Sequence, residues 1–193
     1  MIDSARYWEA RYAGGGNSGT GSSGHLAAFK AEIVNHLVRK YGIRSVLELG
    51  CGDGRQLALA RYPSYIGVDV SATAIRLCQE RFAGDASKAF ILGTGDGLRA
   101  DMVISLEVIF HLVEDDVFES YMRRLVAAGD RLLVIYSSNR DPDPASAPHV
   151  RHRHVVRWMT ANAPEWGKPE VVRNRYPRRS FSDFFIYRRR RVP

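Results

Sequence analysis

The stretch that decides the fold is Ser45–Gly54, which reads SVLELGCGDG. Its first half is a short apolar run that contains one acid, Glu48, and its second half alternates three glycines with Cys51 and Asp53. A short apolar run bounded by glycines is typical of a buried strand. Glycine lets the backbone turn tightly and approach a ligand without a Cβ clash, so we expect a ligand at the end of this strand.

Strand-like and helix-like segments alternate around this stretch, which predicts an α/β fold with a parallel sheet covered by helices. Two β-like runs joined by a short loop near the C-terminus predict a final antiparallel pair. We expect parallel strands at 45–49, 65–69, 88–92, 101–106 and 131–137, helices at 25–42, 54–61, 72–82, 115–128 and 149–163, and the antiparallel pair at 170–176 and 183–190.

Composition bounds the class of protein. The chain has 193 residues, 45% of them apolar and 25% charged, which predicts one globular domain over residues 1–193. The two cysteines, Cys51 and Cys78, give no disulfide framework and no zinc spacing, which fits a reducing compartment. No signal peptide and no apolar run long enough for a bilayer is visible, so we expect a cytoplasmic protein without membrane contact.

Charge is distributed unevenly along the chain. The formal net charge is +7, and the segment from Arg140 onward holds 13 Arg and Lys residues against 5 Asp and Glu residues. Basic character in one segment indicates an anionic partner, such as nucleic acid, phosphate or carboxylate. For the RRRR run at 188–191 alone, the alternative is a solvated end that keeps the protein soluble.

The acid inside the first strand separates two classes of cofactor. Enzymes that bind a dinucleotide use G-x-G-x-x-G, whereas the glycines here are spaced Gly50-x-Gly52-x-Gly54, and Glu48 repels a pyrophosphate. A sulfonium cofactor with an ammonium group is attracted by the same acid. The stretch VLELGCGDG, followed by IGVDVS at 66–71, resembles the class I S-adenosylmethionine-dependent methyltransferases.

This resemblance implies a doubly wound, seven-stranded, mostly parallel sheet of the Rossmann-like type that ends in an antiparallel pair. It implies S-adenosyl-L-methionine as cofactor, with Glu48 near its amino group, Asp69 on its ribose and Val70 beside its adenine. After the third strand, Thr94, Asp96 or the backbone near Gly93 is expected to contact the adenine. The implied cofactor-binding set is Glu48, Gly50, Cys51, Gly52, Gly54, Asp69, Val70, Thr94, Leu106, Tyr7 and Trp8.

The N-terminal segment combines aromatic residues with a glycine-rich loop. Tyr7, Trp8 and Tyr12 precede residues 13–24, which read AGGGNSGTGSSG and are not expected to form a helix. In family members with a W-x-x-x-Y opening this part folds over the cofactor, and an aromatic face attracts a sulfonium. We expect residues 1–24 to act as a lid; the alternative is a flexible connection whose aromatics fill the core.

Substrate chemistry is expected at the end of the fourth strand, in ISLEVIFHLVEDD at 104–116. Neither N/D-P-P-Y nor Pro-Cys is present, which argues against methylation of adenine or glutamine amino groups and of cytosine C5. Glu107 and His111 lie four residues apart, one helical turn, and are the candidate catalytic residues. His111 can take a proton from a hydroxyl; the alternative is a histidine packed under the sheet edge.

The same segment is similar to E-x-x-E-H, a metal-binding pattern of small-RNA 3′-end 2′-O-methyltransferases and quinone-biosynthesis O-methyltransferases. Phe110 stands where that pattern has its second acid. The later HVRHRH at 149–154 resembles the additional histidine motif of the RNA enzymes. Because Glu107, His111 and one later histidine make a thin ligand set, no functional metal is predicted.

The HVRHRH segment is also the candidate substrate wall. Arginine and histidine together suit a phosphate, sulfate or carboxylate on the acceptor. The alternative is a solvated basic face of a helix. The predicted substrate-binding residues are His149, Arg151, His152 and Arg153.

The sequence therefore predicts a methyltransferase that acts on an oxygen of a small, anionic acceptor, such as a sugar or a natural-product intermediate. One alternative is an RNA 2′-O-methyltransferase, and another is a non-catalytic cofactor-binding protein that regulates a partner. A nicotinamide oxidoreductase is disfavoured by Glu48 and by the short glycine spacing.

Overall fold

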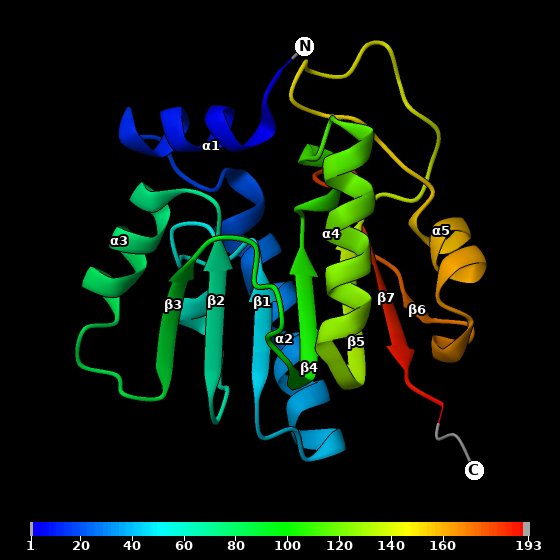
Figure 1. Cartoon of the computed structure of the whole chain (residues 1–193), viewed down its shortest axis with the longest axis horizontal. Coiled ribbons are helices and arrows are strands. Elements are labelled where there is room, and N and C mark those ends of the chain that lie inside the picture. The colour runs from blue at the N-terminus through cyan, green and yellow to red at the C-terminus, as the bar shows by residue number, and fades with distance from the viewer. Residues whose placement is uncertain (1, 191–193) are drawn as a thin grey trace.

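A seven-stranded sheet with the order β3-β2-β1-β4-β5-β7-β6 forms the centre of the computed structural model, which describes residues 2–190 (Figure 1). The first five strands are parallel, β7 runs antiparallel to β5, and β6 runs antiparallel to β7. The predicted fold class is therefore confirmed. The strands are β1 Val46–Leu49, β2 Tyr65–Asp69, β3 Lys88–Leu92, β4 Ala100–Leu106, β5 Gly129–Ser137, β6 Glu170–Val172 and β7 Asp183–Arg188.

Helices cover both faces of the sheet, because alternate residues of the central strands are buried on opposite sides. On one face Ile104 and Val134 pack in a cluster with Phe29 of one helix and Ile75 of another. On the other face Leu133 belongs to a second cluster with side chains of two later helices. The helices are α1 Ser4–Ala13, α2 Gly24–Tyr41, α3 Ala72–Arg81, α4 Asp115–Ala128 and α5 Val155–Asn162.

The first helix does not pack on a face of the sheet. Figure 1 shows α1 lying across the end of the molecule toward which the parallel strands point, above β2 and β3. The side chain of Asp3 caps this helix by accepting a hydrogen bond from the backbone N–H of Arg6. The carboxyl ends of the parallel strands thus lie beneath a helix that comes from the N-terminal segment.

Two predicted helices are wrong in extent. The segment 54–61 contains only a single 3₁₀ turn, Leu57–Leu59, because Gly54 has a left-handed φ of 74° and the chain is extended again at Ala60. The segment 149–163 is helical only over Val155–Asn162, because its first six residues lie in a turn and loop that are bonded to neighbouring loops.

Smaller differences concern the termini of the chain. The expected antiparallel runs are shortened to β6 and β7, and the helix α1 was not foreseen. The segment 13–24 contains one 3₁₀ turn, Thr20–Ser22, although no helix was expected there. Within residues 2–190, no helix combines the length and the apolar character needed to cross a membrane.

Truncating a core side chain tests this arrangement. Leu133 on β5 has 0% of its surface exposed, so Leu133→Ala is expected to lower the free energy of unfolding by about 2–5 kcal/mol through lost burial and a cavity. Leu92→Ala on β3 is the matched control, because Leu92 is 55% exposed and its truncation is expected to change stability by less than about 0.5 kcal/mol. Urea unfolding followed by circular dichroism measures both; equal losses would contradict the assigned core.

Candidate active site

A cleft of about 410 Å³ opens at the carboxyl ends of β1, β2 and β4. Its walls come from the glycine turn after β1, the ends of β2 and β4, the helices α1 and α2, and the loop between β6 and β7. Parallel sheets bind ligands at this end, where several strands deliver side chains to one place. The cleft is therefore the candidate active site.

The glycine turn can exist only without side chains at two positions. Gly50 and Gly52 have left-handed φ values of 83° and 58°. A Cβ on Gly50 would lie 2.5 Å from Cγ2 of Val108, and a Cβ on Gly52 would lie 2.4 Å from Oγ of Ser18. Both glycines and Cys51 line the cleft. The predicted residue Gly54 is not among the lining residues; it packs against α3 instead.

Glu48 is a buried carboxylate in the wall of the cleft. The hydroxyl of Tyr65 donates a hydrogen bond of 2.6 Å to its Oε2. Burial raises the pKa of Glu48 to about 7, although the Tyr65 hydrogen bond and the positive charge of Lys30 act in the opposite direction. A nearby positive group on a ligand would therefore favour the ionised form of this carboxylate.

Asp69 ends β2 and holds the glycine turn. Its Oδ2 accepts a hydrogen bond of 2.9 Å from the N–H of Gly52, and its Oδ1 accepts one of 2.9 Å from the N–H of Ser71. Burial raises the pKa of this carboxyl, whereas the backbone donors lower it. The adjacent Val70 lines the cleft and is 47% exposed, so an apolar surface lies beside the buried acid.

The other predicted cofactor residues divide into two groups. Thr94, Leu106 and Trp8 line the cleft, whereas Tyr7 is not among the lining residues. Tyr7 instead stacks on His149, with ring centroids 4.6 Å apart. Asp96, the alternative at the end of β3, is absent from the lining and bonds the Thr94 hydroxyl.

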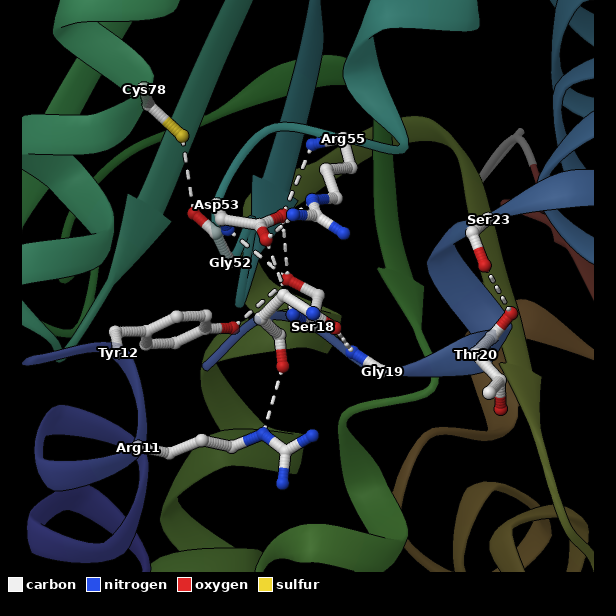
Figure 2. A network of polar contacts seen from close by, with 11 residues as sticks. Arg11, Tyr12, Ser18, Gly19, Thr20, Ser23, Gly52, Asp53, Arg55 and Cys78 are labelled. Atoms are coloured by element: carbon white, nitrogen blue, oxygen red, sulfur yellow. Dashed lines mark hydrogen bonds and ion pairs between the residues drawn. The ribbon is translucent and has the colours of Figure 1, made fainter. Parts of the chain in front are cut away.

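The N-terminal segment docks directly on the glycine turn, as Figure 2 shows. Oγ of Ser18 donates a hydrogen bond of 2.8 Å to Oδ1 of Asp53, and the N–H of Ser18 donates one of 3.2 Å to Oδ2. The Tyr12 hydroxyl lies 3.0 Å from Oγ of Ser18. The close approach of Ser18 depends on the missing side chain at Gly52.

Helix α1 is fastened at two further points. Oγ of Ser4 donates a hydrogen bond of 2.8 Å to the carbonyl of His111, and the N–H of Ser4 donates one of 2.8 Å to Glu114. Glu9 accepts hydrogen bonds of 2.6 Å from the hydroxyls of Ser71 and Thr73 at the start of α3. Residues far apart in sequence therefore hold α1 over the cleft.

His111 faces the cleft as a neutral imidazole with a defined tautomer. Its Nδ1 lies 3.0 Å from the backbone carbonyl of His149, and because a carbonyl only accepts, Nδ1 carries the proton. Burial, helped by the charges of His149 and Arg11, lowers the pKa of His111 to about 4, although the His149 carbonyl and the charge of Glu107 act in the opposite direction. Nε2 is therefore an unprotonated acceptor at neutral pH.

Glu107 lines the cleft but is already engaged. Its Oε2 lies 2.7 Å from Nζ of the buried Lys30, and its Oε1 accepts a hydrogen bond of 3.2 Å from the Ser180 hydroxyl. Its backbone φ of 63° is the one left-handed value at a non-glycine position within residues 2–190. Because both carboxylate oxygens of Glu107 are engaged by other side chains, the arrangement favours His111 over Glu107 as a base.

The predicted substrate wall is only partly present. His149 lines the cleft, but Arg151, His152 and Arg153 are not among the lining residues. Arg151 donates to the carbonyl of Val113, Arg153 donates to the carbonyl of Leu112, and both arginines pair with Asp115. Nδ1 of the buried His152 lies 2.9 Å from the Ser138 hydroxyl. These bonds hold the segment in a loop, which explains why the predicted helical face does not form.

Four other cations line the cleft and were missed by sequence reasoning: Arg11, Lys30, Arg124 and Arg179. Arg11 lies one helical turn after Trp8, and Arg179 lies in the basic PRRSFS loop, so both had a local signal. Lys30 had none, because its partner Glu107 is 77 positions away. Within the described part of the chain, no group of three or more His, Cys, Asp and Glu residues is arranged to hold a metal ion.

Comparisons with known proteins agree with this geometry. Residues 46–129 match the family model described as "Methyltransferase domain". The ubiquinone biosynthesis O-methyltransferase of Bradyrhizobium diazoefficiens is 29% identical over 136 residues, which cover 66% of this chain and 52% of that protein. The protein of the same name from Chelativorans sp. is 25% identical over 135 residues, with coverage of 66% and 53%. The chain thus spans about half the length of these curated relatives.

The fold has a close match among solved structures. The N-methyltransferase NodS of Bradyrhizobium japonicum WM9, in complex with S-adenosyl-L-homocysteine, has a TM-score of 0.70 at 15% identity. The match covers 97% of this chain and 99% of that chain. At this identity the likeness establishes the fold.

The buried carboxylate of Glu48 makes stability depend on pH. The folded protein keeps the Glu48 proton up to about pH 7, whereas the unfolded chain releases it near 4.5. Stability is therefore expected to fall as pH rises from 4.5 to 7, and Glu48→Gln is expected to remove roughly 2 to 3 kcal/mol of that fall.

Urea unfolding at pH 5 and pH 8 measures this difference. Glu170→Gln is the matched control, because Glu170 is exposed on β6 and its removal is expected to leave the pH dependence unchanged. The lowered pKa of His111 has the opposite effect, since it makes stability rise with pH below pH 6.5. This contribution is the same in wild type, Glu48→Gln and Glu170→Gln, so it cancels when they are compared. An identical pH profile for wild type and Glu48→Gln would show that Glu48 ionises normally.

Proposed function

The chain carries a methyltransferase domain of the class I, S-adenosylmethionine-dependent family, and we propose that it transfers a methyl group from this donor to an oxygen atom of a small anionic acceptor. The family prediction is confirmed by the match over residues 46–129. The proposal rests above all on one observation: a single cleft is lined by two buried carboxylates, by a neutral histidine, and by Arg11 and Arg179, which have no acidic partner within residues 2–190.

The residues at the carboxylate end fit the donor chemically. Gly50 and Gly52 leave a backbone cradle that a Cβ would fill. The carboxylate of Asp69 suits ribose hydroxyls, the exposed Val70 suits a flat base, and Glu48 suits an ammonium group. When bound, the donor supplies an electrophilic methyl group on a sulfonium.

His111 is the proposed general base. Its Nδ1–H is held by the carbonyl of His149, so Nε2 is free to accept the proton of an acceptor hydroxyl. Because the pKa of His111 is lowered to about 4, the imidazole is neutral over the physiological range. The curated relatives named O-methyltransferase support oxygen as the atom that is methylated.

An anionic acceptor is supported by two arginines in the lining of the cleft. Arg11 and Arg179 line it, and neither has an acidic partner within residues 2–190. The charge of Arg11 lowers the pKa of both His111 and His149, so its guanidinium lies close to the proposed base. Phe110, Val117 and Phe181 add apolar wall, which suits a ring between the anionic group and the hydroxyl.

The N-terminal segment is proposed to act as a lid. The contacts of Ser4, Glu9 and Ser18 hold residues 2–24 over the cleft, and each contact is a small number of hydrogen bonds that can open. We regard residues 1–193 as one catalytic domain, which acts in the cytoplasm without a resident metal. Within this account the lid excludes water during transfer.

Replacing the base tests the proposed chemistry. His111→Asn keeps an N–H for the His149 carbonyl but has no group equivalent to Nε2, so methyl transfer is expected to fall roughly 10²- to 10⁴-fold. Binding of S-adenosylhomocysteine is expected to stay within about twofold of wild type, since the residues that hold it are untouched. His36→Asn is the control, because His36 is exposed on α2.

The measurement is transfer of radiolabelled methyl from S-adenosylmethionine to hydroxybenzoates, sugar phosphates and an oligoribonucleotide. A small anionic acceptor with His111-dependent turnover is the expected result. Transfer to the ribonucleotide, with binding that weakens as salt rises, would identify the RNA 2′-O-methyltransferase instead. Donor binding without any transfer would identify a non-catalytic regulator, and binding of a nicotinamide dinucleotide alone would contradict the proposal.

A further inference from the structure

His111 stands at the end of a very short element. It closes the single 3₁₀ turn Ile109–His111, which follows β4. A turn of three residues has too few hydrogen bonds of its own to hold a side chain in one orientation. The ring is nevertheless fixed, since its Nδ1 donates a hydrogen bond of 3.0 Å to the carbonyl of His149. The contacts that fix this histidine therefore come from other segments of the chain.

One set of contacts comes from the loop that precedes α5. The N–H of Arg151 donates a hydrogen bond of 2.7 Å to the carbonyl of Phe110, which joins this loop to the 3₁₀ turn. The rings of His149 and His111 are nearly parallel, with an interplanar angle of 14° and centroids 5.4 Å apart. His149 thus offers both a carbonyl and an aromatic face. It lies in a turn of a loop, so it needs support itself.

The second set of contacts comes from α1. The ring of Trp8 meets that of His111 at 74°, with centroids 4.8 Å apart, an edge-to-face arrangement that aromatic pairs favour. The ring of Tyr7 stacks on that of His149 at 12°, with centroids 4.6 Å apart. Two neighbouring residues of α1 therefore hold the histidine and the residue that orients it.

The backbone of the 3₁₀ turn is tied to the same helix. Oγ of Ser4 donates a hydrogen bond of 2.8 Å to the carbonyl of His111 and accepts one of 3.2 Å from the N–H of Val113. Ser4 is buried, and an alanine at this position makes neither bond. The first turn of α1 thus fixes the path of the chain at His111, while its second turn fixes the ring.

We infer that α1 assembles the base, so that His111 takes its working orientation only when the N-terminal segment is docked. The inference rests on the proposed function, in which His111 is the base, and it gives the lid a role beyond the exclusion of water. Ser4, Tyr7 and Trp8 are positioning residues in this account. Tyr7 isolates the effect best, because it does not line the cleft and reaches His111 only through His149.

Docking of α1 also keeps the imidazole of His111 neutral. Burial is the largest cause that lowers its pKa to about 4, and Trp8 covers the ring. Of the charged groups around the ring, His149 and Arg11 lower this pKa and Glu107 raises it. Loosening α1 returns water to the ring and removes Arg11 from its neighbourhood, so the pKa is expected to rise toward 6.5. The titration of His111 therefore reports the docking of α1 without knowledge of the acceptor.

Tyr7→Leu tests the inference, because it removes the ring that supports His149 and leaves the lining of the cleft intact. The pKa of His111 is expected to rise by about 1 or more, and kcat for any acceptor that is methylated is expected to fall roughly 10-fold. Binding of S-adenosylhomocysteine is expected to stay within about twofold of wild type. NMR of the histidine side chains follows the titration, with His111→Asn to assign the resonance. Tyr7→Phe keeps the ring and is expected to behave as wild type.

A double-mutant cycle with His149→Ala, which keeps the backbone carbonyl, tests the route of the effect. Tyr7→Leu is expected to add little in that background, and full additivity would overturn the inference. Arg6→Gln is the matched control, because Arg6 is an exposed residue of the same helix, and it is expected to match wild type in every measurement.

The remaining outcomes separate this inference from the proposed function. An unchanged pKa of His111 in a folded Tyr7→Leu protein would overturn the inference, as would a loss that Tyr7→Phe shares. If Tyr7→Leu does not fold, Ser4→Ala decides, since it is expected to raise the same pKa and an unchanged pKa overturns the inference. Full methyl transfer by His111→Asn would contradict the proposed base instead, whatever the titration of His111 shows.

Discussion

The absence of side chains at Gly50 and Gly52 is the constraint on which the site depends. At Gly50 it lets Val108, beyond the end of β4, close against the turn after β1. At Gly52 it admits Ser18, which carries the whole N-terminal segment onto Asp53. A side chain at either position would force Val108 or Ser18 to move. The turn therefore shapes both the proposed cofactor site and the contact with the N-terminal segment, which is the proposed lid.

Two buried acids lie beside this turn, and their burial lowers the stability of the protein when no ligand is bound. Glu48 is buried with a pKa raised to about 7, and Asp69 is buried with a raised pKa. Lys30 is already engaged by Glu107, so it offsets these acids only in part. Such groups lower the stability of the protein unless a ligand of complementary charge is present. Functional sites commonly lose stability in this way in favour of binding. A cationic donor is the ligand that the arrangement suits.

Much of the fold could be predicted from the sequence, because buried parallel strands read as apolar runs bounded by glycine. Gly42, with a φ of 57°, ends α2 where the sequence indicated. The spacing of residues wrongly predicted a helix at 149–154. There the side chains of Arg151, His152 and Arg153 bond to distant loops, and these bonds replace the helix. Local pattern carries no information on such bonds.

The candidate site was predictable to a similar degree. Glu48, Asp69 and His111 were identified because their residue types are unusual for their places in the pattern. Lys30 was not, since a lysine on an amphipathic helix ordinarily faces water, and only the tertiary fold brings it to Glu107. The sequence also does not reveal that a lysine holds Glu107. Because of this contact, His111 alone is proposed as the base.

The most direct measurement is a crystal structure of the protein with S-adenosylhomocysteine. The account predicts that the nucleoside lies over the ends of β1 and β2, with the ribose hydroxyls on Asp69 and the sulfur directed toward His111. A cleft that stays empty at saturating ligand, or that is filled by a nicotinamide dinucleotide instead, would contradict it.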